Sequence, residues 1–115
     1  MASQEDRLKV ISDYMEKRKN NNPGEELVKF FTSNGVLVTP DKGTYNGRDA
    51  LLKYYSDTPT PMCFMKVSGP IKGTYTYTLE FRVGATEAFA VTIKKITANF
   101  EFEGNTSLFK KITLV

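Results

Sequence analysis

The sequence predicts a single α+β domain over residues 1–115, in which three N-terminal α-helices are wrapped by a cone-shaped, curved antiparallel β-sheet. Apolar residues recur at helical spacing before residue 56, and they alternate with polar residues after residue 71. Hydrophobic residues make up 40% of the chain and charged residues 25%. This composition is typical of one globular domain and excludes a disordered chain or a coiled coil.

The first helix is predicted to begin after Ser3 and to end at the three asparagines 20–22. Ser3 can cap this helix because Asp6 stands three residues on, as in a capping box. An apolar stripe at helical spacing begins at Leu8 and continues through Met15. Asparagine tolerates the left-handed conformation in which many helices end.

A second helix is predicted to follow at once, with Asn22 as its cap and Pro23 at its first position. Glu25 can reach back to the cap. The helix is expected to stop at the turn dipeptide formed by residues 34–35. Four apolar residues form its predicted buried face: Leu27, Val28, Phe30 and Phe31.

A short strand and a third helix complete the first half of the chain. Residues 36–39 predict a strand that Pro40 ends, and residues 41–47 predict a connecting loop. The third helix is expected over residues 48–55, with Asn46 as its cap.

Four antiparallel strands are predicted from residue 62 onward. The first covers residues 62–67 and the last residues 108–115. Between them, one strand alternates cleanly, so that five apolar residues share one face. These residues are Tyr75, Tyr77, Leu79, Phe81 and Val83.

The strand over residues 88–103 changes the phase of its alternation. Its apolar residues are odd-numbered up to Ile93 and even-numbered from Ile96. A β-bulge within residues 93–96 would cause this slip, because one extra residue re-aims every later side chain. The alternative is a strand that exchanges its core-facing side between two packed faces. A sheet bent in this way, with helices on its concave side, would enclose an apolar pocket.

Charge and composition exclude several function classes. The net charge is +3, but the basic residues come as scattered pairs that split across a strand, so we expect no nucleic-acid binding. The chain has no histidine, which removes histidine-based nucleophile activation and histidine metal ligands, and we expect no metal and no cofactor. No apolar run suits a membrane span or a signal peptide. With Cys63 as its single cysteine, the chain is expected to be cytoplasmic and not to contact a membrane.

Two segments carry a resemblance to a known superfamily. Residues 30–40, FFTSNGVLVTP, and residues 43–52, GTYNGRDALL, resemble the nuclear transport factor 2-like superfamily. Its members share a helix ending in Phe, a short strand before a proline, a glycine-flanked loop and a helix with Ala followed by Ile or Leu. The superfamily includes polyketide cyclases of the SnoaL-like type, ketosteroid isomerase and scytalone dehydratase. The resemblance implies the cone fold over the whole chain, because the motifs are signatures of fold and not of reaction.

Ketosteroid isomerase is the most informative enzyme of this superfamily for comparison. The resemblance places Tyr14 and Tyr55 where that enzyme has pocket tyrosines. It places Thr39 at the catalytic base and Ala98 at the protonated acid of the oxyanion hole. Threonine is no base at neutral pH and alanine donates no hydrogen bond, so we expect no isomerisation of ketosteroids. Whether any reaction is catalysed stays open, and we expect none.

The expected function is binding of a small apolar ligand in the cone. The candidate ligand-binding residues are Tyr14, Thr39, Tyr55, Cys63, Met65 and Asn99. The alternative is a dimeric scaffold that works through protein contacts, and a further alternative is a cyclase or isomerase-like enzyme with other residues. A homodimer through the outer face of the sheet is expected in either case. The reason is that the apolar residues of strands 75–83 and 96–102 are expected to exceed one buried face.

Overall fold

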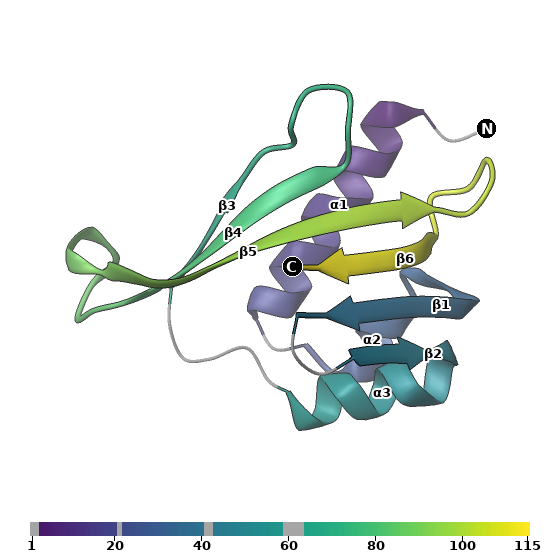
Figure 1. Cartoon of the computed structure of the whole chain (residues 1–115), viewed down its shortest axis with the longest axis horizontal. Coiled ribbons are helices and arrows are strands. Elements are labelled where there is room, and N and C mark those ends of the chain that lie inside the picture. The colour runs from purple at the N-terminus through teal and green to yellow at the C-terminus, as the bar shows by residue number, and fades with distance from the viewer. Residues whose placement is uncertain (1–2, 21, 41–42, 59–63) are drawn as a thin grey trace.

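The computed structural model of the chain describes residues 3–20, 22–40, 43–58 and 64–115. Within these residues three α-helices, a short 3₁₀ helix and six β-strands follow one another along the chain (Figure 1). The helices are α1 (Gln4–Lys19), α2 (Gly24–Val28), α3 (Gly47–Asp57) and the 3₁₀ helix Glu87–Phe89. The strands are β1 (Phe31–Thr39), β2 (Gly43–Asn46), β3 (Phe64–Ser68), β4 (Thr76–Val83), β5 (Val91–Phe102) and β6 (Phe109–Leu114).

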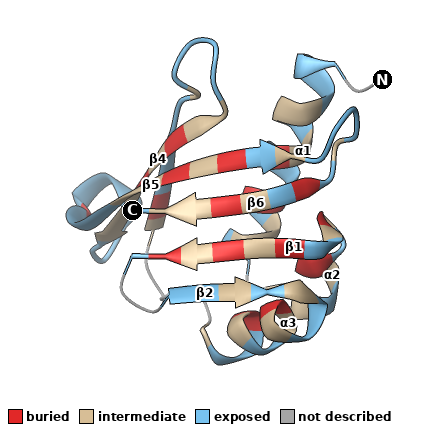
Figure 2. Ribbon diagram, turned by 45° about the vertical axis from the view of Figure 1, so that its right-hand side comes forward, coloured by how far each residue is buried: buried red, intermediate tan, exposed pale blue. Residues whose placement is uncertain are grey.

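The six strands form one curved sheet in the order β2-β1-β6-β5-β4-β3. The predicted α+β cone is confirmed, with α1 lying across one face of the sheet (Figures 1 and 2). The prediction of a wholly antiparallel sheet needs one correction. Strands β3 to β6 pair antiparallel, as does β1 with β2, but β1 and β6 run parallel. The sheet is therefore mixed.

Helix α1 begins with the predicted capping box. The Ser3 hydroxyl accepts a hydrogen bond from the Asp6 N–H at 3.1 Å, and an Asp6 carboxylate oxygen accepts one from the Ser3 N–H at 3.3 Å. Further along the helix, Ile11, Tyr14 and Met15 are buried. This helix therefore turns its apolar stripe toward the sheet, as its spacing predicts.

The second helix is shorter than predicted. It ends at Val28, and Phe31 already belongs to β1, where it pairs with Phe109 of β6. Extended backbone at Phe31 allows this pairing, which a continued helix would prevent. The predicted turn at residues 34–35 lies inside β1, at an irregularity in its pairing with β6. The predicted cap is also wrong, because Pro23 stands at the cap position and not at the first helical position. The Asn22 side-chain amide instead donates to the Glu26 carboxylate at 2.7 Å.

The predicted loop over residues 41–47 is also partly wrong. Residues 43–46 form β2, which pairs with the end of β1, while residues 41–42 lie outside the described part of the chain. Helix α3 has Asn46 at its cap position, as predicted, although the Asn46 side chain makes no capping hydrogen bond. The helix continues two residues beyond the predicted end, to Asp57.

The bulge predicted within residues 93–96 is confirmed. Phe81 of β4 pairs with Lys94, but the next residue, Arg82, pairs with Thr92. Ile93 is therefore the extra residue on β5, and it bends the strand at that point. Beyond the bulge, β4 and β5 continue as a hairpin arm, residues 83–93, that extends away from the helices (Figure 1).

The premise of the homodimer prediction is wrong. Tyr77 pairs with Ala98 and Leu79 pairs with Ile96, and residues directly opposite each other share a face of the sheet. The odd-numbered apolar residues of β4 and the even-numbered ones of β5 therefore face the core together. Both strands show a buried stripe in Figure 2. The outer face of β4 carries polar and charged residues, so the homodimer stays a prediction without that support.

One hydrophobic cluster joins the helices to the concave face of the sheet. Residues with less than 2% exposure come from α1, α2, α3 and the central strands, and they include Ile11, Leu27, Leu51 and Phe109. Among the described residues, no helix is both long and apolar enough to span a membrane.

Candidate functional site

A cavity of about 380 Å³ lies between the concave face of the sheet and helices α1 and α3. This volume falls in the lower part of the range for small-molecule sites, roughly 300–1,000 Å³. Its walls are mostly apolar, with residues such as Leu37, Leu79 and Phe100 from the sheet and Met15 from α1. The sheet's curvature, the bulge and the two helices together leave this space unfilled.

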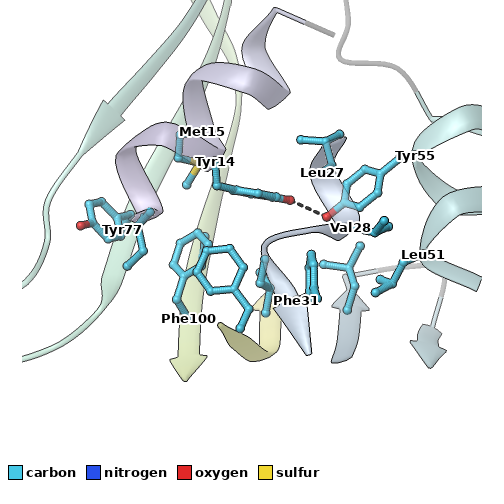
Figure 3. Packing of buried hydrophobic residues seen from close by; sticks show 14 of the residues in the cluster. Tyr14, Met15, Leu27, Val28, Phe31, Leu51, Tyr55, Tyr77 and Phe100 are labelled. Carbon is cyan, nitrogen blue, oxygen red and sulfur yellow. Dashed lines mark hydrogen bonds between the residues drawn. The ribbon is translucent and has the colours of Figure 1, made fainter. Parts of the chain in front are cut away.

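Two tyrosine hydroxyls meet at the cavity wall. Tyr14 on α1 and Tyr55 on α3 form a hydrogen bond of 2.6 Å between their oxygens (Figure 3). Their side chains are 6% and 5% exposed, and both line the cavity. The Tyr14 ring packs edge-on against the rings of Phe100 and Phe109, which fixes its position.

This pair has one more proton than its mutual hydrogen bond uses. Two phenol groups carry two O–H protons, and one of them forms the bond between the oxygens. The hydroxyl that accepts this bond keeps its own proton for another acceptor. A ligand in the cavity can supply that acceptor, because both tyrosines line the space.

Burial keeps both phenols neutral. It raises the pKa of Tyr14 from the ordinary value of 10.0 to about 12, and the pKa of Tyr55 well above that value. The hydrogen bond with Tyr55 and the positive charge of Arg18 lower the pKa of Tyr14, but by less than burial raises it. At neutral pH the pair is therefore a hydrogen-bond donor and not an anion or a base.

Arg18 extends the polar side of the cavity. Its guanidinium carbon lies 5.1 Å from the centre of the Tyr55 ring and 5.8 Å from that of Tyr54, in cation–π contacts. One guanidinium nitrogen donates to the Thr58 carbonyl at 2.6 Å. These contacts hold a positive charge beside the tyrosine pair.

The two positions compared with the isomerase acids both lie on the cavity wall. Thr39 is buried at the end of β1, where its hydroxyl donates to the Gly43 carbonyl at 3.4 Å. Ala98 is completely buried on β5. None of the described lining residues is Asp or Glu, and the described residues contain no cluster of three or more potential metal ligands.

The structure brings together four of the six candidate residues. Tyr14, Thr39, Tyr55 and Met65 line the cavity, whereas Cys63 falls outside the described residues. Asn99 does not line the cavity. It follows Ala98 on β5 and faces the opposite side of the sheet, where its side-chain oxygen accepts a hydrogen bond of 2.5 Å from the Thr76 hydroxyl.

Two charged residues of this wall, Arg18 and Lys94, are not among the candidate residues that the sequence predicts. Arg18 stands four residues after Tyr14, so helical spacing alone places the two on one face of α1. Lys94 lies two residues before Ile96, on the same face of β5. Both positions were therefore visible in the periodicity.

No protein-family model matches the chain, and no curated protein matches it. Several solved structures share its fold. The epoxide hydrolase/cyclase-like enzyme SalBIII, studied for pyran ring formation in salinomycin, is 16% identical, with a TM-score of 0.68 over 99% of this chain and 92% of its own. A nuclear transport factor 2-like protein of unknown function from Burkholderia pseudomallei is 13% identical, with a TM-score of 0.67 over 95% and 88% of the two chains.

A third similar structure is the Orange Carotenoid Protein of Anabaena binding canthaxanthin. It is 18% identical, with a TM-score of 0.62 over 91% of this chain, which spans 34% of that protein. Likenesses at these identities show the fold and not the activity. The chain thus has the nuclear transport factor 2-like fold that its sequence resembles.

Proposed function

We propose that this protein binds a small, largely apolar ligand that carries a hydrogen-bond acceptor, inside the cavity of the cone. The observation that carries the proposal is the buried Tyr14–Tyr55 pair, which retains one hydroxyl proton at the wall of an otherwise mostly apolar cavity. A cone filled by Phe and Met side chains would have favoured a scaffold. A cavity bordered by phenol hydroxyls favours a ligand.

The names of two similar structures mention organic molecules. The Anabaena protein binds canthaxanthin, and SalBIII is studied for ring formation in a polyether. The first name is that of a carotenoid-binding protein and the second that of an enzyme of polyether formation. They support a ligand of that kind for this fold, while the absence of Asp and Glu among the described lining residues gives no support to acid–base chemistry here.

The test is the binding of a neutral fluorescent probe, N-phenyl-1-naphthylamine, followed by its increase in emission. Ile96 lines the cavity and is only half-buried, so Ile96→Phe extends a ring into the space without displacing the core. We expect this variant to weaken probe binding at least about tenfold, equal to about 1.4 kcal/mol. Thr97→Phe is the matched control, because Thr97 lies on the outer face of the same strand.

A second control separates the cavity from the exposed arm. Phe89 on the arm is 81% exposed and could attract an apolar probe by itself. Phe89→Ser is expected to leave probe affinity unchanged. The proposal is overturned if the wild type shows no saturable binding, or if Ile96→Phe binds the probe as well as Thr97→Phe does.

A second candidate function is a scaffold made of two copies of this chain. It is favoured by the arm, where Phe89, Val91 and Ile93 are all more than 60% exposed. Exposed apolar groups of this kind often mark interfaces, and two-fold pairing is the commonest assembly. Light scattering at micromolar concentration tests it. A mass near 13.0 kDa counts against pairing, and a dimer that Phe89→Ser dissociates supports it.

A further inference from the structure

The charges around the cavity narrow the chemistry of its ligand. Two of the described lining residues, Arg18 and Lys94, are cationic and none is acidic. They come from different elements, Arg18 from α1 and Lys94 from β5. These two charges make the potential along the described lining positive, and water screens the exposed Lys94 more than the half-buried Arg18.

The next residue on β5, Lys95, is also a lysine, but its charge lies outside the cavity. Lys95 points to the outer face of β5, where it forms an ion pair of 3.4 Å with Glu80. Lys94 pairs with Phe81 on the cavity side. The bulge at Ile93 sets this arrangement, since the residues after it alternate from that point.

We propose that the ligand is an apolar carboxylate, whose carboxylate group accepts the remaining hydroxyl proton of the Tyr14–Tyr55 pair within the field of Arg18 and Lys94. This inference rests on the proposed function. An anionic acceptor makes a stronger hydrogen bond than a neutral one, and a charge taken into an apolar cavity must be compensated. Here a neutral hydroxyl donates the bond, Arg18 places a positive charge beside the tyrosine pair, and the exposed Lys94 adds a second charge on the cavity wall.

The same lining disfavours the other ligand charges. A cationic ligand would face two cations, with no carboxylate among the described lining residues to accept its N–H groups. A neutral ligand can accept the tyrosine proton but gains nothing from the positive field. An apolar carboxylate uses the hydroxyl, the charges and the apolar walls together.

Three naphthalene compounds of similar shape provide the test: 2-naphthoate, 2-naphthamide and 2-naphthylmethylamine. The chain contains no tryptophan, so naphthalene fluorescence can be excited with little contribution from the protein. At pH 7 we expect naphthoate to bind at least about tenfold more tightly than the amide, and the amine to bind most weakly.

Lys94→Met and Lys95→Met form a matched pair of variants. Methionine keeps most of the apolar stem of lysine and removes its charge. We expect Lys94→Met to bring the affinities for naphthoate and the amide to within about threefold of each other, through a larger loss of affinity for naphthoate than for the amide. Lys95→Met is expected to keep the wild-type preference. Circular dichroism and urea unfolding establish that both variants fold.

The outcomes distinguish this inference from the proposed function. Equal affinities for naphthoate and amide, or a preference for the amine, overturn the inference and leave a ligand-binding cavity in place. A loss of affinity for naphthoate and amide alike in Lys94→Met also overturns it, because Lys94 would then act by packing. If no naphthalene compound and no neutral probe binds saturably, both the inference and the proposed function fall.

Discussion

The buried tyrosine pair should make the protein lose stability at high pH. The pKa of Tyr14 is about 12 in the folded protein and 10.0 when unperturbed. Between these values the unfolded chain has lost the proton that the folded protein retains. Unfolding then releases a proton, so rising pH favours the unfolded state. The stability that burial of the neutral phenol retains is complete below pH 10 and disappears as the pH rises through 12.

The size of the effect follows from the shift. Two pKa units correspond to about 2.7 kcal/mol in total, of which about 1.4 kcal/mol is lost at pH 11. The pKa of Tyr55 is also raised, by burial first and then by Tyr14 nearby, and its ionisation adds to the loss. The double variant Tyr14→Phe/Tyr55→Phe removes both ionisations. Its free energy of unfolding at pH 7 should differ little from that of the wild type, because both partners of the hydrogen bond are replaced together.

Urea unfolding followed by circular dichroism, repeated from about pH 8 to about pH 11, measures this difference. We expect the double variant to become the more stable protein at the alkaline end, by about 1.4 kcal/mol or more. Tyr45→Phe is the control, since Tyr45 is half-buried and does not line the cavity. If the wild type and the double variant lose stability in parallel, the pair is not held neutral by burial and the reasoning is wrong.

Two further predictions concern the fold. Gly35→Ala should cost about 1–3 kcal/mol of unfolding free energy, because a Cβ at this buried glycine would lie 2.7 Å from two side-chain atoms of Phe31. The exposed neighbour in Asn34→Ala is its control, and equal urea midpoints for the two would contradict the clash. Ser3→Ala should cost about 1 kcal/mol by removing the side-chain acceptor of the capping box. Gln4→Ala is its control, and a Ser3→Ala midpoint unchanged from the wild type would show that the cap contributes nothing.

Three features that depend on local sequence were predicted correctly, although the cap predicted at Asn22 was not. The capping box at Ser3, the cap position of Asn46 and the bulge near residue 93 each depend on residues a few positions apart. The parallel pairing of β1 with β6 joins the two halves of the chain, and no local pattern marks it. The helix predicted through Phe31 failed for the same reason. Pairing with Phe109, far along the chain, outweighs the local helical spacing there.

Alternation within a strand predicts which of its residues share a face, but it does not predict which face of the neighbouring strand lies beside them. Each strand's own period was correct, but the homodimer argument needed their relative register, which the connection between them sets. Tyr77 opposite Ala98 puts odd and even residues on one face. With this register, the apolar residues of β4 and β5 that were expected on the outer face lie on the core face.

Some residues of the candidate site could be predicted from local sequence patterns, and others could not. Tyr14 and Tyr55 lie 41 residues apart on two helices, and only the resemblance to ketosteroid isomerase suggested them together. Lys94 could have been assigned from the sequence. Once Ile96 and Ala98 face the core, alternation places Lys94 on the same side and Lys95 on the other. The phase slip that predicts the bulge also decides which lysine faces the cavity. With Ile93 as the extra residue, Lys94 lies opposite Phe81 on the cavity side, and Lys95 lies opposite Glu80 on the outer face.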